Sequence, residues 1–201
     1  GLGQSGYVQA FMKALLPGLT TEPAEGSSRA LRAVIVDADG LNNLAAVPGW
    51  PAMLKAPAIL TPHPGEMAKL TGLSVAEVQA DRLGMARKYA AEWNAVVLLK
   101  GAPTIVAAPD GRARINPFTN PVMATGGTGD VLAGAIAGFV AQGVEPFDAA
   151  CLALYVSSQV GEMLRQEMGS AGMLAGDLAA SLPRAMKDLR ELAQRQQQLL
   201  D

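Results

Sequence analysis

The run Ala95-Val96-Val97-Leu98-Leu99-Lys100-Gly101 places five apolar residues directly before a lysine and a glycine. A short continuous apolar run of this kind is typical of a strand that is buried on both faces of a sheet. Similar runs occur at residues 33–36 and 58–60, and stretches with helical periodicity separate them. This alternation predicts an α/β fold with a mainly parallel sheet and helices on both faces, an α-β-α sandwich.

The remaining elements follow from periodicity and turn residues. We expect helices over about residues 7–16, 74–93, 130–142, 146–168 and 177–200, and a β-hairpin whose strands, 104–108 and 112–115, flank the turn Pro109-Asp110-Gly111. Ser74 and Glu77 form a capping box that opens the second helix. The helix over 130–142 is apolar almost all round, so we expect it in the core. No repeat or linker divides the chain, which predicts one domain over residues 1–201.

Composition restricts the partners that we expect. Half of the 201 residues are apolar and 17% are charged, which favours a folded core over a disordered chain. The net charge of −2 disfavours a nucleic-acid partner, and the longest apolar run, 11 residues at 131–141, is too short for a membrane span. The single cysteine and the lack of a signal-peptide pattern favour a cytoplasmic protein. Because His63 is the only histidine, the chain holds no multi-histidine metal site.

Polar clusters follow the three predicted parallel strands. They are Asp37-Ala38-Asp39-Gly40-Leu41-Asn42, Thr61-Pro62-His63-Pro64-Gly65-Glu66, and Lys100-Gly101. Ligands of open α/β sheets bind outside the carboxyl ends of the strands. The sequence therefore predicts a binding site where these clusters meet.

The most specific motif is Gly126-Gly127-Thr128-Gly129-Asp130, directly before the apolar helix. Glycines let the backbone approach a ligand closely, and the first N–H groups of the helix favour an anion such as phosphate. Asp130 could accept a proton from a hydroxyl that attacks phosphorus, or bind Mg²⁺. The alternative is a glycine-rich turn in which Asp130 only caps the helix.

The first six residues, Gly1-Leu2-Gly3-Gln4-Ser5-Gly6, match G-x-G-x-x-G. In a dinucleotide-binding fold this motif follows a strand, and an acid lies about 20 residues further on. Glu22 and Glu25 are near that distance, but they lie in a Pro/Gly loop, so a dehydrogenase is the least favoured hypothesis. A glycine turn before a helix is the simpler interpretation, and a domain that starts on such a turn looks truncated.

Taken together, the motifs resemble those of the ADP/ATP-dependent NAD(P)H-hydrate dehydratase family of the ribokinase-like superfamily. The matching stretches occur in family order: Gly1-Leu2-Gly3, residues 36–42, residues 60–66, Leu99-Lys100-Gly101-Ala102-Pro103-Thr104, and residues 126–134. The last stretch is specific only to the superfamily. The combination of residues 61–66, residues 37–42 and Lys100-Gly101-Ala102 is far more specific to the family.

The resemblance implies repair of hydrated NADH and NADPH. ADP or ATP would be the co-substrate, and Mg²⁺ would bind with the nucleotide. The ring hydroxyl would be phosphorylated, and phosphate would then leave. Asp130 would act as the base, and Gly126, Gly127 and Gly129 would form the anion hole. The nucleotide-binding residues would be Lys100, Gly101, Ala102, Pro103, Thr104, Gly126 and Gly129. The residues near the hydrated dinucleotide would be Gly3, Asp39, Asn42, His63, Asn120 and Asp130.

The resemblance also implies features beyond the site. Family members have a further N-terminal segment, so we expect a truncated domain. They commonly assemble as homotetramers or larger, and a longer parent chain could carry an epimerase domain. Two alternatives stay open: a ribokinase-like kinase of a vitamin-type alcohol, and a catalytically silent nucleotide-binding fragment. His63 could also be only a helix cap, because Pro64 and Glu66 suit a helix start.

Overall fold

A computed structural model describes residues 2–22 and 30–198. One sheet contains β1 (Val34–Val36), β2 (Ala58–Leu60), β3 (Val96–Leu99), β4 (Ile105–Ala107) and β5 (Ala113–Ile115), in that spatial order. β1, β2 and β3 are parallel, and β4 and β5 complete the sheet as an antiparallel hairpin. The predicted strands and hairpin are confirmed.

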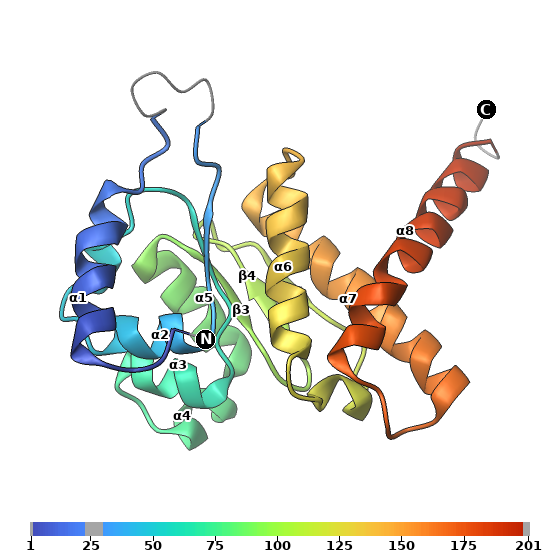
Figure 1. Cartoon of the computed structure of the whole chain (residues 1–201), viewed down its shortest axis with the longest axis horizontal. Helices are drawn as coiled ribbons and strands as arrows, with labels where there is room; N and C mark the ends of the chain where they lie inside the picture. Colours follow the sequence, from blue (N-terminus) through green and yellow to red (C-terminus); the bar gives the residue numbers. More distant parts are fainter. Residues whose placement is uncertain (1, 23–29, 199–201) are drawn as a thin grey trace.

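Helices cover both faces of the sheet (Figure 1). One face carries α1 (Gly6–Leu15), α2 (Asp39–Ala45), α3 (Pro64–Thr71), α4 (Val75–Ala80) and α5 (Arg82–Trp93). The other carries α6 (Thr128–Ala141), α7 (Pro146–Met168) and α8 (Ala175–Gln198). Short 3₁₀ turns occupy Leu16–Gly18, Trp50–Met53 and Pro121–Ala124. The α-β-α sandwich is confirmed, and none of the described helices has the length and apolarity to cross a membrane.

The continuous apolar runs form strands because both of their faces are covered. In β3, Val97 and Leu99 belong to the core under α1–α5, whereas Val96 and Leu98 belong to the core under α6–α8. Burying each such side chain contributes about 1.5–3 kcal/mol. Alternate residues of one strand therefore stabilise two separate helical layers.

The helix expected over residues 74–93 is two helices, so that prediction is wrong. The chain breaks at Asp81, whose φ of −142° and ψ of 72° are not helical. The Asp81 carboxylate accepts a hydrogen bond of 2.8 Å from the N–H of Gly84 and so caps the second helix. A short acidic side chain can compete with the helix for backbone donors in this way. The apolar periodicity of the sequence gives no sign of this competition.

The expectation that the helix over 130–142 lies in the core is confirmed for one side only, which contributes Leu132, Ile136, Phe139 and Val140. This helix, α6, exposes Gly134, Ala137 and Gly138 along one side. That side borders a hollow of about 790 Å³ lined by residues 30–33, Ile35, Ala137, Val140 and Ala141. The hollow lies beside β1, an edge strand of the described sheet. Small apolar residues look the same in a sequence whether another layer covers them or not.

Candidate functional site

The N-terminus of α6 meets the carboxyl ends of β1 and β3. Gly127 begins the helix with φ of 87°, a conformation that favours glycine. Next to it, a Cβ atom placed on Gly129 would lie 3.5 Å from Asp37 Oδ2 and 3.5 Å from Lys100 Nζ. The glycine turn and the strand that ends in Lys100 therefore come together. Free N–H groups at the helix start and a nearby ammonium suit a phosphate group.

Lys100 lies between two carboxylates. Its Nζ is 2.7 Å from Asp37 Oδ1 and 4.0 Å from Glu66 Oε2. The Glu66 side chain is 5% exposed, and those of Asp37 and Lys100 are 12% and 23% exposed, so water screens these charges only weakly. Sequence analysis placed Asp37 in the polar cluster after the first strand but did not identify its partner, which is 63 residues away.

His63 is the N-cap of α3. Its Nδ1 accepts hydrogen bonds from the N–H groups of Gly65 at 3.0 Å and Glu66 at 3.2 Å, and Glu66 Oε2 accepts one of 2.8 Å from the His63 N–H. This is a complete capping box. The imidazole is nevertheless 57% exposed and lines the same pocket as Lys100. The helix-cap interpretation therefore describes Nδ1. His63 Nε2 lies 3.5 Å from Glu66 Oε1, and the exposed part of the ring can meet a ligand.

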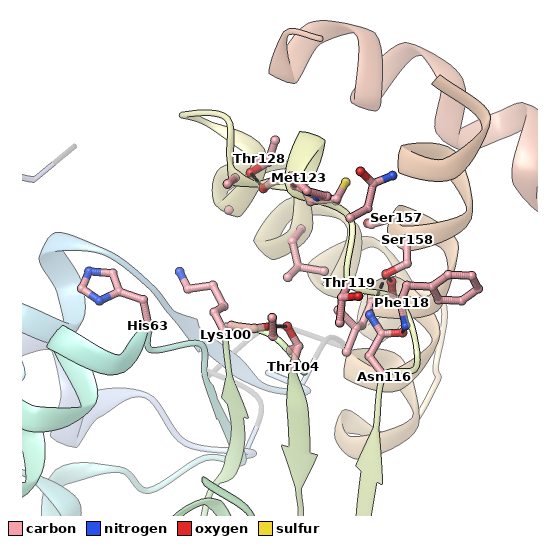
Figure 2. A pocket seen from close by; sticks show the side chains of 18 of the residues that line it. His63, Lys100, Thr104, Asn116, Phe118, Thr119, Met123, Thr128, Ser157 and Ser158 are labelled. Carbon is pink, nitrogen blue, oxygen red and sulfur yellow. Dashed lines mark hydrogen bonds between the residues drawn. The ribbon is translucent and has the colours of Figure 1, made fainter. Parts of the chain in front are cut away.

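A pocket of about 440 Å³ extends from His63 and Lys100 to α7 (Figure 2). Seven of the predicted residues line it: His63, Lys100, Gly101, Ala102, Thr104, Asn120 and Gly129. The structure adds residues to which the sequence analysis gave no role in binding: Pro64, Asn116, Phe118, Thr119, Pro121, Met123, Ala124, Thr128, Leu132, Leu154, Ser157 and Ser158. Most of these come from the loop after β5 and from α7, which carry no recognisable motif.

The two ends of the pocket differ in character. Figure 2 shows His63 and Lys100 at one end, and Phe118, Ser157 and Ser158 at the other. At the α7 end, Asn116 Nδ2 donates to Ser158 Oγ at 2.8 Å. Apolar walls with a few fixed polar groups are typical of a small-molecule site.

Three predicted substrate residues form a separate cluster. The N–H of Gly3 donates to Asp39 Oδ2 at 3.0 Å, and Gln4 Nε2 donates to Asp39 Oδ1 at 3.0 Å. The bond from Gln4, followed by that from Gly3, lowers the pKa of the Asp39 carboxyl. Asn42 Oδ1 accepts from Lys69 Nζ at 2.7 Å. Gly3, Asp39 and Asn42 do not line the pocket, and Gly1 lies outside the described residues.

Sequence reasoning missed the residue that secures this cluster. Asn43, which is 1% exposed, donates from Nδ2 to the carbonyls of Gly3 at 2.8 Å and Asp39 at 2.7 Å. The N-terminal glycine turn is thus bound to the carboxyl end of β1. Glu22, one of the two acids considered for a dinucleotide fold, lies in a bend away from any strand end, and Glu25 is outside the described residues.

The other predicted residues of the glycine turn lie around the pocket rather than in its wall. Asp130 is exposed in the first turn of α6, one residue after Gly129. Gly126 is exposed, and a Cβ on Gly127 would come within 3.0 Å of Ala175 at the start of α8. Pro103 also does not line the pocket. Asp130 is therefore accessible to solvent, next in the chain to a residue that lines the pocket.

Comparison with known proteins identifies close relatives. A sequence model of the family described as NAD(P)H-hydrate dehydratase matches residues 1–184. The bifunctional NAD(P)H-hydrate repair enzyme Nnr of Moorella thermoacetica is 47% identical over 184 residues, which cover 89% of this chain and 35% of that protein. The ADP-dependent (S)-NAD(P)H-hydrate dehydratase of Neisseria meningitidis is 40% identical, with 82% of this chain and 54% of that protein covered.

A solved structure agrees with these relatives. The Bacillus subtilis ADP/ATP-dependent NAD(P)H-hydrate dehydratase, co-crystallised with ATP and Mg²⁺, has a TM-score of 0.69 and is 38% identical. The match covers 78% of this chain and 55% of that one. The chain therefore spans between about a third and about half of the length of the relatives it matches.

Proposed function

Because the chain belongs to the NAD(P)H-hydrate dehydratase family, we propose that it supports the nucleotide-dependent repair of hydrated NADH and NADPH. The pocket would bind ADP or ATP, with the phosphates at Lys100 and Gly129 and the base toward α7. The single observation that carries this proposal is the position of Gly129, where an added Cβ atom would lie 3.5 Å from both Lys100 Nζ and Asp37 Oδ2.

The proposed chemistry converts a poor leaving group into a good one. The hydroxyl oxygen of the hydrated ring attacks the terminal phosphorus of the nucleotide, and the bond from that phosphorus to the rest of the nucleotide breaks. The ring nitrogen lone pair then expels phosphate, and loss of a neighbouring proton restores the conjugated dihydropyridine. Hydroxide is a far poorer leaving group than phosphate, so the nucleotide supplies the driving force.

Each predicted residue has a role in this proposal. Asp130 accepts the proton of the attacking hydroxyl, because it follows Gly129 at the mouth of the pocket. The N–H groups of Gly126, Gly127 and Gly129 hold the transferred phosphoryl group. The dinucleotide would lie near His63 and extend toward the cluster of Gly3, Asp39 and Asn42. Lys100, Gly101, Ala102 and Thr104 would line the nucleotide, with Pro103 in the same segment, and Asn120 would contact the hydrated dinucleotide.

The residues present fit a magnesium ion that arrives with the nucleotide. The described residues contain no group of three or more His, Cys, Asp or Glu side chains that could hold a metal alone. Mg²⁺ beside a nucleotide needs only one or two carboxylates, since phosphates and waters complete its shell. Asp37 and Glu66, the carboxylates nearest to Lys100, would hold it. The ion would neutralise phosphate charge.

The family resemblance also bears on location in the cell and on oligomeric state. We expect a cytoplasmic homo-oligomer, as the family resemblance implies, and size-exclusion chromatography with light scattering tests the assembly. The relatives named bifunctional carry a second repair activity, and the proposal for this chain covers the dehydratase activity only.

One assay separates this proposal from its alternatives. Hydrated NADH is incubated with the protein, Mg²⁺ and ADP or ATP, and absorbance of the reduced nicotinamide is followed. Nucleotide-dependent recovery of absorbance supports a dehydratase. A stable phosphorylated alcohol would instead indicate a kinase. Calorimetric ADP binding without turnover would indicate a silent nucleotide-binding fragment.

A further inference from the structure

Arg82 binds the backbone of residues 100–104, which we call the nucleotide segment because the proposed function assigns them to the nucleotide. It is the first residue of α5 and does not line the pocket. Its Nη2 donates to three carbonyls, those of Leu99 at 3.2 Å, Lys100 at 3.2 Å and Pro103 at 2.8 Å. These carbonyls come from both ends of the segment. One guanidinium that does not line the pocket therefore ties the segment to α5.

The local backbone is shaped to receive this group. A Cβ on Gly101 would come within 2.7 Å of Arg82 Nη2, so a side chain at that position would push the guanidinium away. Gly101 also has φ of 144°, which side chains rarely adopt. Arg82 Nη1 donates to Gln79 Oε1 in α4. The guanidinium thus bridges the break at Asp81 between α4 and α5.

An arginine suits this position better than another cation. A guanidinium keeps its charge at all physiological pH values and presents several donors in a rigid fork. An ammonium is a point charge on a flexible stem, and it cannot reach Gln79 and three converging carbonyls with the same geometry.

We propose that Arg82 is a positioning residue for the nucleotide: by fixing the carbonyls of Leu99, Lys100 and Pro103, it sets where the Lys100 side chain lies relative to the start of α6. This inference rests on the proposed function of the pocket. Lys100 Nζ lies beside Gly129, so a shift of the backbone at Lys100 would move the ammonium away from the phosphate position. Small displacements of positioning groups cost binding and rate disproportionately.

The test compares Arg82→Met and Arg82→Lys with the unaltered chain. ADP affinity is measured by calorimetry, and KM for ADP, KM for hydrated NADH and kcat are measured by the absorbance assay. We expect Arg82→Met to lower the affinity for ADP roughly tenfold or more and to change KM for hydrated NADH by less than about twofold. The ADP affinity of Arg82→Lys should lie between those of the unaltered chain and Arg82→Met. Hydrogen exchange should speed up at residues 99–104 but not in the rest of α5.

Arg87→Met is the matched control, because Arg87 is exposed on the same helix and its guanidinium lies near Gly111 rather than the nucleotide segment. It should leave ADP affinity unchanged. If Arg82→Met does not fold, Arg82→Lys decides. A folded variant that binds ADP normally and shows only a lower Tm would overturn the proposal. If the unaltered chain fails to bind ADP, the proposed function itself is wrong, a result distinct from failure at Arg82.

Discussion

Lys100 and Asp37 lie 63 residues apart in the chain and form an ion pair with 2.7 Å between Nζ and Oδ1. The pair joins the carboxyl ends of β3 and β1 and faces Gly129 at the start of α6. A lysine that is fixed by a carboxylate next to a helix N-terminus is oriented before a phosphate arrives. Such preorganisation reduces the entropy that binding has to overcome.

Asp37→Asn should destabilise the fold, because it leaves a largely buried ammonium without its charged hydrogen-bond partner. We expect the free energy of unfolding to fall by roughly 1–3 kcal/mol in urea titrations. Asp110→Asn is the control, since the Asp110–Arg112 pair is more than half exposed, and it should change stability by less than about 0.5 kcal/mol. Equal losses in the two variants would show that the Lys100–Asp37 pair is not special.

Gly129→Val should abolish nucleotide binding. A Cβ at this position would already touch Asp37 Oδ2 and Lys100 Nζ, and the two further methyl groups would occupy the proposed phosphate position. Calorimetry with ADP measures the loss. Gly134→Val places the same side chain five residues later on α6, where a Cβ meets nothing within 4 Å, and this variant should bind ADP normally. Wild-type affinity in Gly129→Val would contradict an anion site here.

Asp130→Asn should retain ADP binding and lose turnover by roughly a few hundredfold or more, because an amide cannot accept the hydroxyl proton. Calorimetry and the absorbance assay measure the two properties separately. Asp148→Asn, in the first turn of α7, controls for the loss of an acidic group near a helix start. Unchanged turnover in Asp130→Asn would remove this residue from the mechanism.

Two substitutions at His63 separate its cap from its imidazole. His63→Ala should lower stability by about 1 kcal/mol, because the N–H groups of Gly65 and Glu66 lose their acceptor. His63→Asn should keep the cap, since asparagine is a favourable N-cap residue. Both variants should lower the affinity for hydrated NADH more than the affinity for ADP. If His63→Asn binds hydrated NADH normally, the role of His63 is structural.

Cys151 should react slowly in the folded protein. Burial, with a smaller contribution from Asp148, raises the pKa of its thiol from 9.0 to about 11. At pH 8 the thiolate is therefore about a hundredfold scarcer than in the unfolded chain, and alkylation by iodoacetamide should slow accordingly. Because the folded pKa is the higher one, the neutral thiol stabilises the fold below pH 9, and this contribution is lost as the pH rises through 11. Equal alkylation rates with and without urea would contradict the prediction.

Much of the architecture could be read from local pattern. The buried runs at residues 58–60 and 95–99 predicted strands because continuous apolar stretches this short have few other uses. The break at Asp81 could not be read, because it depends on one carboxylate competing with the helix for a backbone donor. The exposed side of α6 could not be read either, because glycine and alanine carry no signal of what covers them.

By itself, the sequence determined the motifs: the glycine turn at 126–129, Lys100 after its strand, and His63 before its helix. Each is a local arrangement, set by backbone freedom, strand termination or capping within a few residues. Only the tertiary structure decided the contacts between them. It paired Asp37 with Lys100, bound Arg82 to the backbone of the nucleotide segment, and brought α7 to the far end of the pocket. These contacts join residues from 17 to 63 positions apart, and sheet order and helix packing set such distances, which no local pattern encodes.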